Sequence, residues 1–559
     1  MVSMKRLLFV FIALFINVEV SMFNVRCSIF NIASACTNLI VGKKASKDGS
    51  VIISYSCDDY GAYGFMNFLP GGKHKKGEMR ALYHYETNNF LGEIPEAEET
   101  YTVVGLMNEH QLSIHETTYG GREELCDTLT GMFDYGSLMY VTLQRSKTAR
   151  EAISVMTKLV EDYGYGSEGE SFSIADPNEA WILEMIGKGP GRKGAVWVAV
   201  RIPDDCISGH ANQSRIRQFP LKDKQNCLYS KDVISFAREK GFFSGKDADF
   251  SFADAYAPAD FGALRFCEAR IWSYFNRWAA DDMNQYLPYA MGDPKASVMP
   301  LYVKPKAPLS VQDVKDMMRD HYEGTPLSIQ DDLGMGPWEM PYRPTPLRFK
   351  VDGKDYFNER PISTQQTANV YVSQMRSWLP DYIGGVVWWG NDDANMVPFT
   401  PVYCGVESVP ECYALRTADT FHFSTRSAFW VQNWVSNMTY LRYSVIFPEV
   451  QAVRDRLEAD FNSLQADTEK KAAAMSEPEA RKFLTAYSHR SAQAMMDEWK
   501  QLAQTIIVKY NDMAIKQQDA NGQYLKTPGG NQRPVKRPGY PEFYKKKIIS
   551  ETGDRYLVK

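Results

Sequence analysis

Short apolar runs alternate with polar turns along the first half of the chain, a pattern that predicts paired β-strands. The first pair comprises residues 37–41 and 50–57, joined by a polar turn at residues 43–49. This hairpin is expected to place residue 36, directly before the first strand, at the edge of a sheet.

The same pattern returns further along and predicts more strands, with one amphipathic helix among them. Ser146 can cap this helix and Gly164 can end it. Between them, Ile153, Met156 and Val160 recur at helical spacing. Many strands with helices packed outside them imply layered α and β structure. The further strands are residues 101–107, 111–118, 171–175, 180–186 and 195–201.

The second half of the chain has a more helical pattern. Residues 265–278 and 310–321 predict helices, and residues 385–389 predict a strand. Residues 448–513 are rich in Ala, Glu, Lys and Gln and predict two long helices that are broken near Ser476. The tail beyond them is rich in proline and glycine, which predicts an extended strap on the surface.

The first 35 residues have the pattern of an export signal. Lys5 and Arg6 precede an apolar run at residues 7–16, which is shorter than the about 20 apolar residues of a spanning helix. We therefore expect an exported, soluble mature protein, periplasmic or extracellular, with no integral membrane segment after signal removal. The long gap before residue 35 indicates a short pro-segment, removed by signal peptidase or by self-cleavage.

A small-residue cleavage signal, Ala33-Ser34-Ala35, stands directly before Cys36. Cleavage there gives the cysteine a free α-amine, and an α-amine with a pKa of about 7.7–8.0 is a suitable base for a thiol with a pKa of about 8.5. Before cleavage the same nitrogen is a non-basic amide, so cleavage is the expected activating step. The alternative interpretation is a lipidated cysteine, which would block the amine and for which Ala33 fits poorly.

The composition is that of an ordinary soluble protein, with 559 residues, a net charge of −5 and 44% hydrophobic residues. This charge does not suggest a nucleic-acid partner. Seven cysteines remain besides Cys27 and Cys36, so at least one is unpaired, and Cys404 with Cys412 can at most close a loop. His110 and His115 differ in parity along one strand and diverge, so we expect no metal, and no cofactor is expected either.

Several motifs, in order over residues 36 to 275, resemble one family of enzymes. With them, the chain is identified as similar to the cysteine dipeptidase family of N-terminal-nucleophile (Ntn) hydrolases, relatives of choloylglycine hydrolases and penicillin V acylases. The likeness weakens but persists towards the C-terminus. The matching motifs are residues 36–46, 48–50, 104–112, 116–122, 171–184, 210–213 and 266–270.

The resemblance implies a four-layer αββα Ntn-hydrolase sandwich with a C-terminal helical extension. Residues 1–35 are then the signal peptide and pro-segment, 36–400 the catalytic domain, and 401–559 the helical extension and a strap packed on the core. In this family the cysteine lies at the end of a central strand and cleaves amide bonds through a thioester. The resemblance implies dipeptide substrates, and a homo-oligomer is left open.

Family roles carry over to four residues. The nucleophile is Cys36, and the aspartate that receives the cysteine amine falls at Asp58. The oxyanion-hole asparagine falls at Asn212, and the arginine that polarises the site falls at Arg265, with Arg270 as its rival.

Two positions depart from the family pattern. Tyr55 stands where relatives often have an arginine, and Thr118 aligns with the second oxyanion asparagine of the acylases. Loss of an arginine beside the thiol removes one source of thiolate stabilisation. The substrate end of the pocket is therefore expected to differ from that of the acylases.

Three functions follow from these observations. The first is a dipeptidase in which the Cys36 thiolate attacks the peptide carbonyl. The second is an N-acyl amide hydrolase of the bile-salt or penicillin V acylase type. The third is an inactive exported binding protein that retains the fold, for which Tyr55 gives slight support.

Overall fold

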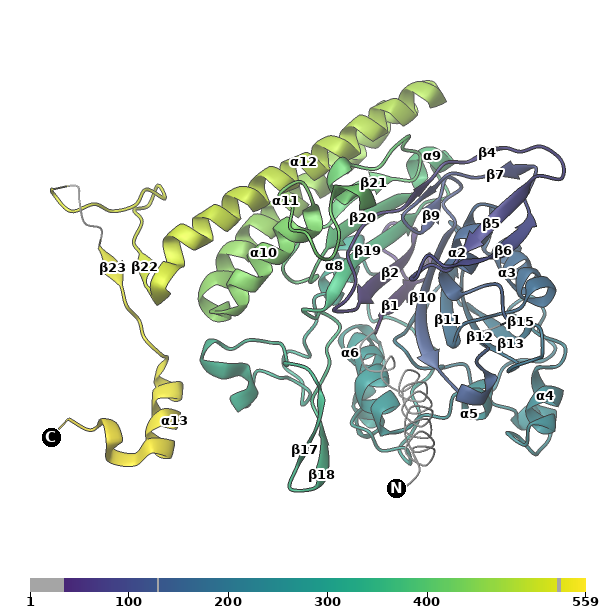
Figure 1. Ribbon diagram of the computed structural model, residues 1–559, viewed down its shortest axis with the longest axis horizontal. Coiled ribbons are helices and arrows are strands. Elements are labelled where there is room, and N and C mark those ends of the chain that lie inside the picture. The colour runs from purple at the N-terminus through teal and green to yellow at the C-terminus, as the bar shows by residue number, and fades with distance from the viewer. Residues whose placement is uncertain (1–34, 128–129, 530–533, 559) are drawn as a thin grey trace, which may run out of the picture.

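The computed structural model describes residues 35–127, 130–529 and 534–558. Two antiparallel sheets pack face to face, and helices cover their outer faces (Figure 1). The fold class expected from the resemblance is therefore confirmed. The expected signal peptide and the rest of the pro-segment before Ala35 lie outside the described residues. No helix within the described residues is long and apolar enough to cross a membrane.

The first sheet contains β1, the strand that follows Cys36. Its strand β1 lies between β14 and β2, so the expectation that residue 36 lies at a sheet edge is wrong. A strand from much later in the chain covers the open side of the hairpin, pairing Asn38 with His210. All four residues of β1 are buried, as in a central strand. In spatial order the strands are β16 (Tyr302–Val303), β14 (Ile207–His210), β1 (Asn38–Val41), β2 (Val51–Asp58), β19 (Thr367–Met375), β20 (Val386–Asn391) and β21 (Thr400–Tyr403).

The second sheet contains the strands predicted in the middle of the chain. Its inner strands β10 and β11 face β2 of the first sheet, which brings side chains of both sheets to one interior. In spatial order the strands are β15 (Cys227–Tyr229), β13 (Ala195–Ile202), β12 (Ala180–Gly187), β11 (Gly169–Ala175), β10 (Ser113–Gly120), β9 (Met107–Asn108), β8 (Val103–Val104) and β3 (Phe68–Leu69).

Helices form the two outer layers. The predicted helix before Gly164 is α3, and Thr148 rather than Ser146 caps it by accepting from the Glu151 N–H. The helix predicted at residues 265–278 is also present, with a π-helical first part, η3, that continues into α6. The second sheet is covered by α2 (Tyr135–Leu143) and α3 (Ala149–Tyr163), and the first by α8 (Val311–Met317), α10 (Ala428–Tyr440), α11 (Tyr443–Ala473) and α12 (Glu477–Tyr510). Further elements are η3 (Ala263–Glu268), α6 (Ala269–Trp278), α4 (Val233–Glu239), α5 (Phe252–Tyr256), α7 (Leu287–Ala290) and α9 (Asp381–Gly384).

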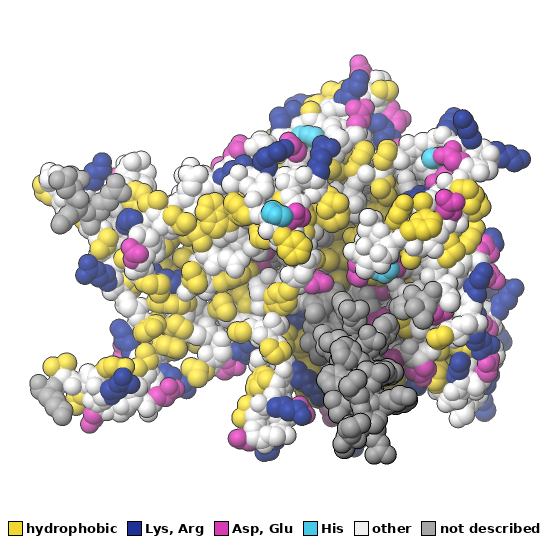
Figure 2. Space-filling model, in the orientation of Figure 1, with side chains coloured by type: hydrophobic (Ala, Val, Ile, Leu, Met, Phe, Trp, Pro, Cys, Tyr) yellow, Lys and Arg dark blue, Asp and Glu magenta, His cyan; other side chains and the backbone are white. Residues whose placement is uncertain are grey.

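The C-terminal part has the two long helices that the composition predicts. Ser476 begins α12 with a capping box, in which its hydroxyl and backbone N–H share the carboxylate of Glu479. Beyond α12, β22 (Ile515–Lys516) pairs with β23 (Val535–Lys536), and a helix that the proline-rich pattern did not predict follows, α13 (Glu542–Thr552). Helix α13 buries no side chain and projects from the body. Hydrophobic side chains are visible over this end of the molecule (Figure 2).

Candidate active site

Cys36 lies directly before β1 at the end of a central strand, and its side chain is 5% exposed. Thr37 bridges Ser56, which places Cys36 opposite Cys57 on β2. In the full chain the Cys36 nitrogen is a peptide N–H, and it donates to Asn212 Oδ1 over 2.9 Å. The geometry described is therefore that of the precursor.

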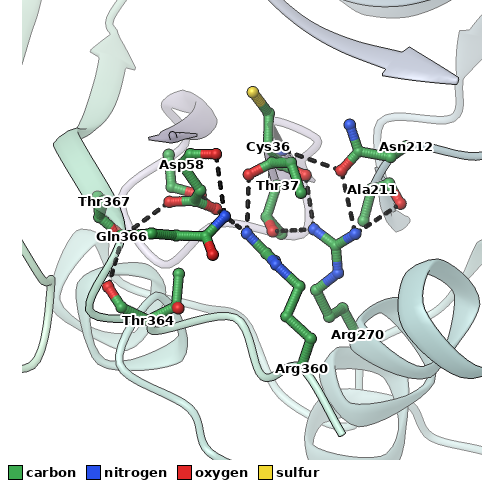
Figure 3. Close-up of polar contacts among 12 residues, drawn as sticks. Cys36, Thr37, Asp58, Ala211, Asn212, Arg270, Arg360, Thr364, Gln366 and Thr367 are labelled. Atoms are coloured by element: carbon green, nitrogen blue, oxygen red, sulfur yellow. Dashed lines mark hydrogen bonds and ion pairs between the residues drawn. The ribbon is translucent and has the colours of Figure 1, made fainter. Parts of the chain in front are cut away.

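One buried arginine, Arg270 of α6, fixes the backbone of the cysteine (Figure 3). Its Nη1 donates to the Cys36 carbonyl at 2.7 Å and to Thr37 Oγ1 at 2.8 Å. Its Nη2 donates to the Ala211 carbonyl and to Asn212 Oδ1, both at 3.0 Å. A planar guanidinium can hold the Cys36 backbone and the Asn212 side chain in one rigid geometry, so Arg270 sets the position of the cysteine relative to the asparagine.

Arg265 has a different place from the one the family pattern indicated. Its Nη2 donates to Glu359 Oε1 at 2.5 Å, and its contacts do not include Cys36, Asp58 or Asn212 within the described chain. Arg265 lies on the π-helical segment η3 and Arg270 on α6, and the two side chains reach different partners. The structure brings Arg270, and not Arg265, to the cysteine.

Asp58 ends β2 and is fully buried. Its carboxylate accepts hydrogen bonds from Ser56 Oγ at 2.9 Å, from Thr367 Oγ1 at 2.7 Å and from Arg360 Nη2 at 2.5 Å. The same Arg360 nitrogen donates to the Ala35 carbonyl at 2.8 Å, and the Ala35 N–H donates to the Asp58 carbonyl at 2.8 Å. Asp58 and Arg360 therefore lie beside the peptide bond that precedes the cysteine.

Asn212 follows β14 with a positive φ of 61°, in the left-handed region that asparagine tolerates better than most residues. Its Nδ2 donates to the Thr118 carbonyl at 2.8 Å, which orients Oδ1 towards the Cys36 nitrogen. In Figure 3, Asp58 and Asn212 lie on opposite sides of Cys36. Three of the four predicted site residues are thus gathered around one peptide bond.

The thiol points away from the two arginines (Figure 3), towards β2 and β10. Its Sγ lies 3.7 Å from the Tyr55 hydroxyl and 3.8 Å from Glu116 Oε1, and the Tyr55 hydroxyl donates to that same oxygen at 2.6 Å. A side-chain hydrogen bond with Cys57, burial and the Glu116 carboxyl together raise the pKa of the Cys36 thiol well above its usual range. The precursor therefore holds its nucleophile as the protonated, unreactive thiol.

The two departures from the family pattern both contact carboxyl groups. Tyr55 hydrogen-bonds to Glu116, and Thr118 Oγ1 donates to Glu170 Oε2 at 3.0 Å. Glu116, Glu170 and Arg360 belong to the site but were not predicted from the sequence. The available signal for the first two was that each is the one acidic residue of its strand.

The histidines of β10 and of the preceding turn have separate partners. His110 Nδ1 lies 3.2 Å from Asp381 Oδ2, whereas His115 Nε2 contacts the hydroxyl groups of Ser113 and Ser373. Burial lowers the pKa of His115 to about 3, so its ring is neutral. Among the described residues, no group of three or more His, Cys, Asp or Glu side chains is placed to hold a metal ion.

An αββα sandwich with a buried cysteine at the end of a central strand is the arrangement of a cysteine-type Ntn hydrolase. The particular family is given by comparison with known sequences. The profile of peptidase family C69 matches residues 35–456, and the chain belongs to this family.

Relatives of this chain carry names of the same kind. It is 27% identical over 391 residues to a protein of Salmonella dublin named "Probable dipeptidase", covering 66% of this chain and 81% of the relative. A "Probable dipeptidase" of Latilactobacillus sakei is 26% identical over 477 residues, covering 82% and 92%. A "Probable dipeptidase B" of Streptococcus pyogenes serotype M1 is 23% identical over 427 residues, covering 74% and 80%.

Proposed function

We propose that this protein is a cysteine dipeptidase that hydrolyses the peptide bond of dipeptides through a thioester on Cys36. The observation that carries the proposal is the fixed position of Cys36 in a member of a peptidase family, with its nitrogen on Asn212 and its carbonyl on Arg270. The names of its relatives support dipeptides as the substrate class.

Cleavage of the bond between Ala35 and Cys36 is the activating step of this proposal. The new α-amine lies where the peptide N–H now donates to Asn212 Oδ1, and Asp58 with Arg360 lies on its other side. The amine takes the thiol proton, and the thiolate attacks the carbonyl carbon of the substrate. The protonated amine then donates to the leaving nitrogen as the C–N bond breaks, and water hydrolyses the thioester.

Asn212 has two roles in this proposal. Its Oδ1 accepts from the Cys36 amine, as it does from the peptide N–H in the precursor. The family resemblance implies a second role for Asn212, in which its amide N–H stabilises the oxyanion of the intermediate. Arg270 acts as a positioning residue, because it contacts Asn212 and the Cys36 backbone rather than the thiol.

The test is hydrolysis by purified protein that begins at Cys36. We expect turnover of dipeptides, no turnover of glycine-conjugated acyl amides, loss of activity in Cys36→Ala and weak activity in Cys36→Ser. Cys412→Ser is the matched control, because this thiol lies on the C-terminal side of the molecule against α12. Turnover of the conjugates alone would establish an acylase, and dipeptide binding without hydrolysis would establish a binding protein.

Export is a second part of the proposal and rests on the charged and apolar pattern of residues 5–16. Fractionation of the producing cell, followed by N-terminal sequencing, tests it. The expected result is a mature chain beginning at Cys36 in the periplasmic or extracellular fraction. Chain that begins at Cys36 but stays in the cytosol would contradict export and leave the proposed chemistry untouched, whereas active full-length chain would contradict the chemistry.

A further inference from the structure

Two buried carboxyl groups lie beside the nucleophile, on paired strands. Glu116 of β10 is 2% exposed and Glu170 of β11 is fully buried. The register pairs Thr118 with Glu170, so Glu116 is the diagonal neighbour of Glu170 on the same face. Both face the interior between the sheets, where Glu116 reaches the Cys36 thiol.

This pair retains unused acceptor capacity. Glu116 Oε1 accepts from Tyr55 and Glu170 Oε2 accepts from Thr118. The other oxygens, Glu116 Oε2 and Glu170 Oε1, are buried, and among the described residues their one source of a hydrogen bond is a proton that the two carboxyls share. Buried polar atoms normally have partners, so when that proton is absent the two oxygens leave a site for a donor from outside the chain.

The proton held by the pair can be exchanged for a cation. Burial, followed by mutual repulsion with Glu116, raises the pKa of Glu170 well above its usual range. Burial likewise raises the pKa of Glu116. Two carboxyls this close hold one proton between them, and a bound cation can replace that proton.

A pocket opens beside Glu116 and gives the direction from which a ligand reaches the pair. Glu116 and Tyr55 both line it, and both contact Cys36 Sγ. Within the described chain, Glu116 is the one ionisable carboxyl group in the lining, and no Lys or Arg is present there. The remaining wall is largely aromatic or apolar and includes Phe65, Leu106, Tyr135, Tyr140, Tyr371 and Trp389.

We propose that Glu116 and Glu170 bind the free α-ammonium group of the N-terminal residue of the substrate. This inference rests on the proposed dipeptidase function and specifies its substrate recognition. In an amino acid the ammonium nitrogen lies about 2.5 Å from the carbonyl carbon, through two bonds. Glu116 Oε1 is 3.8 Å from the sulfur that attacks this carbon, so one substrate residue can reach both groups.

This subsite excludes N-acylated substrates. An acyl amide places a neutral group against the carboxyl pair and leaves the buried oxygens without a charged partner. An ammonium bound there also offsets the negative charge that raises the thiol pKa, so the correct substrate favours formation of its own nucleophile. Recognition of the amine and activation of the thiol are thereby coupled through Glu116.

The experiment compares a dipeptide with its N-acetylated form, using mature wild-type protein and the variants Glu116→Gln and Glu170→Gln. Glu161→Gln, an exposed position on α3, is the matched control. The wild type is expected to hydrolyse the free dipeptide at least about 100-fold better than the acetylated form. Each site variant is expected to raise KM for the free dipeptide about 10- to 100-fold. Each is also expected to reduce the preference for the free dipeptide over its N-acetylated form.

Failure of the inference and failure of the proposed function give different results. If the wild type hydrolyses neither dipeptide, the proposed function itself is wrong. Equal hydrolysis of both forms by the wild type overturns the ammonium subsite while the dipeptidase stands. So does a loss of kcat on both substrates in Glu116→Gln with KM unchanged, which assigns Glu116 to the thiol alone.

Discussion

At the scale of single residues, three atoms of Cys36 have separate partners. The nitrogen donates to Asn212, the carbonyl accepts from Arg270, and the sulfur lies against Tyr55 and Glu116. The backbone is fixed on one side, and the thiol lies against two residues that line the pocket. Small displacements of such a nucleophile have large kinetic effects, because attack requires a narrow geometry.

Substitution of Arg270 by lysine is expected to lower kcat about 100-fold with a smaller effect on KM. A lysine has one ammonium group and cannot hold the Cys36 carbonyl and Asn212 together as the guanidinium does. Steady-state kinetics of the folded variant measure this split. Arg265→Lys is the control, because Arg265 pairs with Glu359 outside the site. A larger loss in Arg265→Lys would restore the original family assignment.

The carboxyl pair predicts a pH dependence of KM. Glu116 and Glu170 have raised pKa values, so their shared proton is present at low pH and blocks the ammonium. The value of 1/KM is therefore expected to rise with pH until the substrate amine deprotonates at about 7.7–8.0. Three other titratable groups act on Glu116, either by direct contact or through their charge: Cys36, Tyr55 and Glu86. All three are unchanged in the control variant Glu161→Gln.

The variant Glu116→Gln distinguishes the titration of the carboxyl pair from the titration of the Cys36 amine. The first is expected in the pH profile of 1/KM and the second in the pH profile of kcat. The acid side of the 1/KM profile is expected to flatten in Glu116→Gln and to keep its wild-type form in Glu161→Gln. The kcat profile is expected to retain its shape in Glu161→Gln. An unchanged 1/KM profile in Glu116→Gln contradicts the assignment.

At the scale of elements, the sequence pattern predicted which helices and strands form but not which elements lie beside each other. The apolar spacing located α3, the composition located α11 and α12, and the predicted break at Ser476 coincides with a capping box. The position of β1 was wrong because its outer neighbour β14 follows much later in the chain. Arg265 could not be ranked against Arg270 from the sequence, because Arg265 lies on a π-helical turn that α-helical spacing does not describe. Arg360 lies in a loop, where side-chain direction has no periodic signal.

A buried ion pair attaches α11 to the catalytic sandwich. Glu458 of α11 accepts from Arg319 and from the Phe399 N–H at 2.8 Å. Burial opposes its ionisation, but Arg319 and Lys315 outweigh burial and lower the pKa of Glu458 to about 2. Its stabilising effect is therefore present above the unfolded pKa of about 4.3 and is lost as pH falls towards 2.

Glu458→Gln is expected to lower the free energy of unfolding by about 3–5 kcal/mol at pH 7, because it leaves Arg319 buried beside a neutral partner. The difference from wild type should shrink as pH falls from about 4 towards 2, because the unfolded wild-type chain takes up the proton at about 4.3 and the folded protein only at about 2. Urea unfolding at pH 7 and below about pH 4 measures this difference in the free energy of unfolding. Asp460→Asn on the same helix is the control, since its exposed pair with Arg456 contributes about 0–1 kcal/mol. Equal effects of the two substitutions would contradict the buried attachment.

At the scale of the whole molecule, the site joins segments from both sheets and from the later part of the catalytic region. Asp58 and Arg360 are separated by 302 positions in the sequence, and Cys36 and Arg270 by 234. These partners meet only when the sandwich is complete. The precursor thus forms the site first, with Ala35 held between Arg360 and the Asp58 carbonyl.

Activity is therefore expected to follow the fraction of chains that begin at Cys36. An aldehyde condenses with an N-terminal cysteine only when its thiol and α-amine are both free, so this reaction counts mature sites. Intact mass and dipeptide hydrolysis are measured on the same samples during maturation. Full activity in chains that retain Ala35 would contradict the requirement for a free amine.

The Cys36→Ala precursor then decides which agent makes the cut. Its Ala35 peptide keeps the contacts of Arg360 and Asp58, but no thiol is present to attack it. If the chain cleaves itself, this variant is expected to keep residue 35 in the purified protein and in the exported fraction. If signal peptidase makes the cut, the variant is shortened at the wild-type rate, because the small residues before position 36 are unchanged.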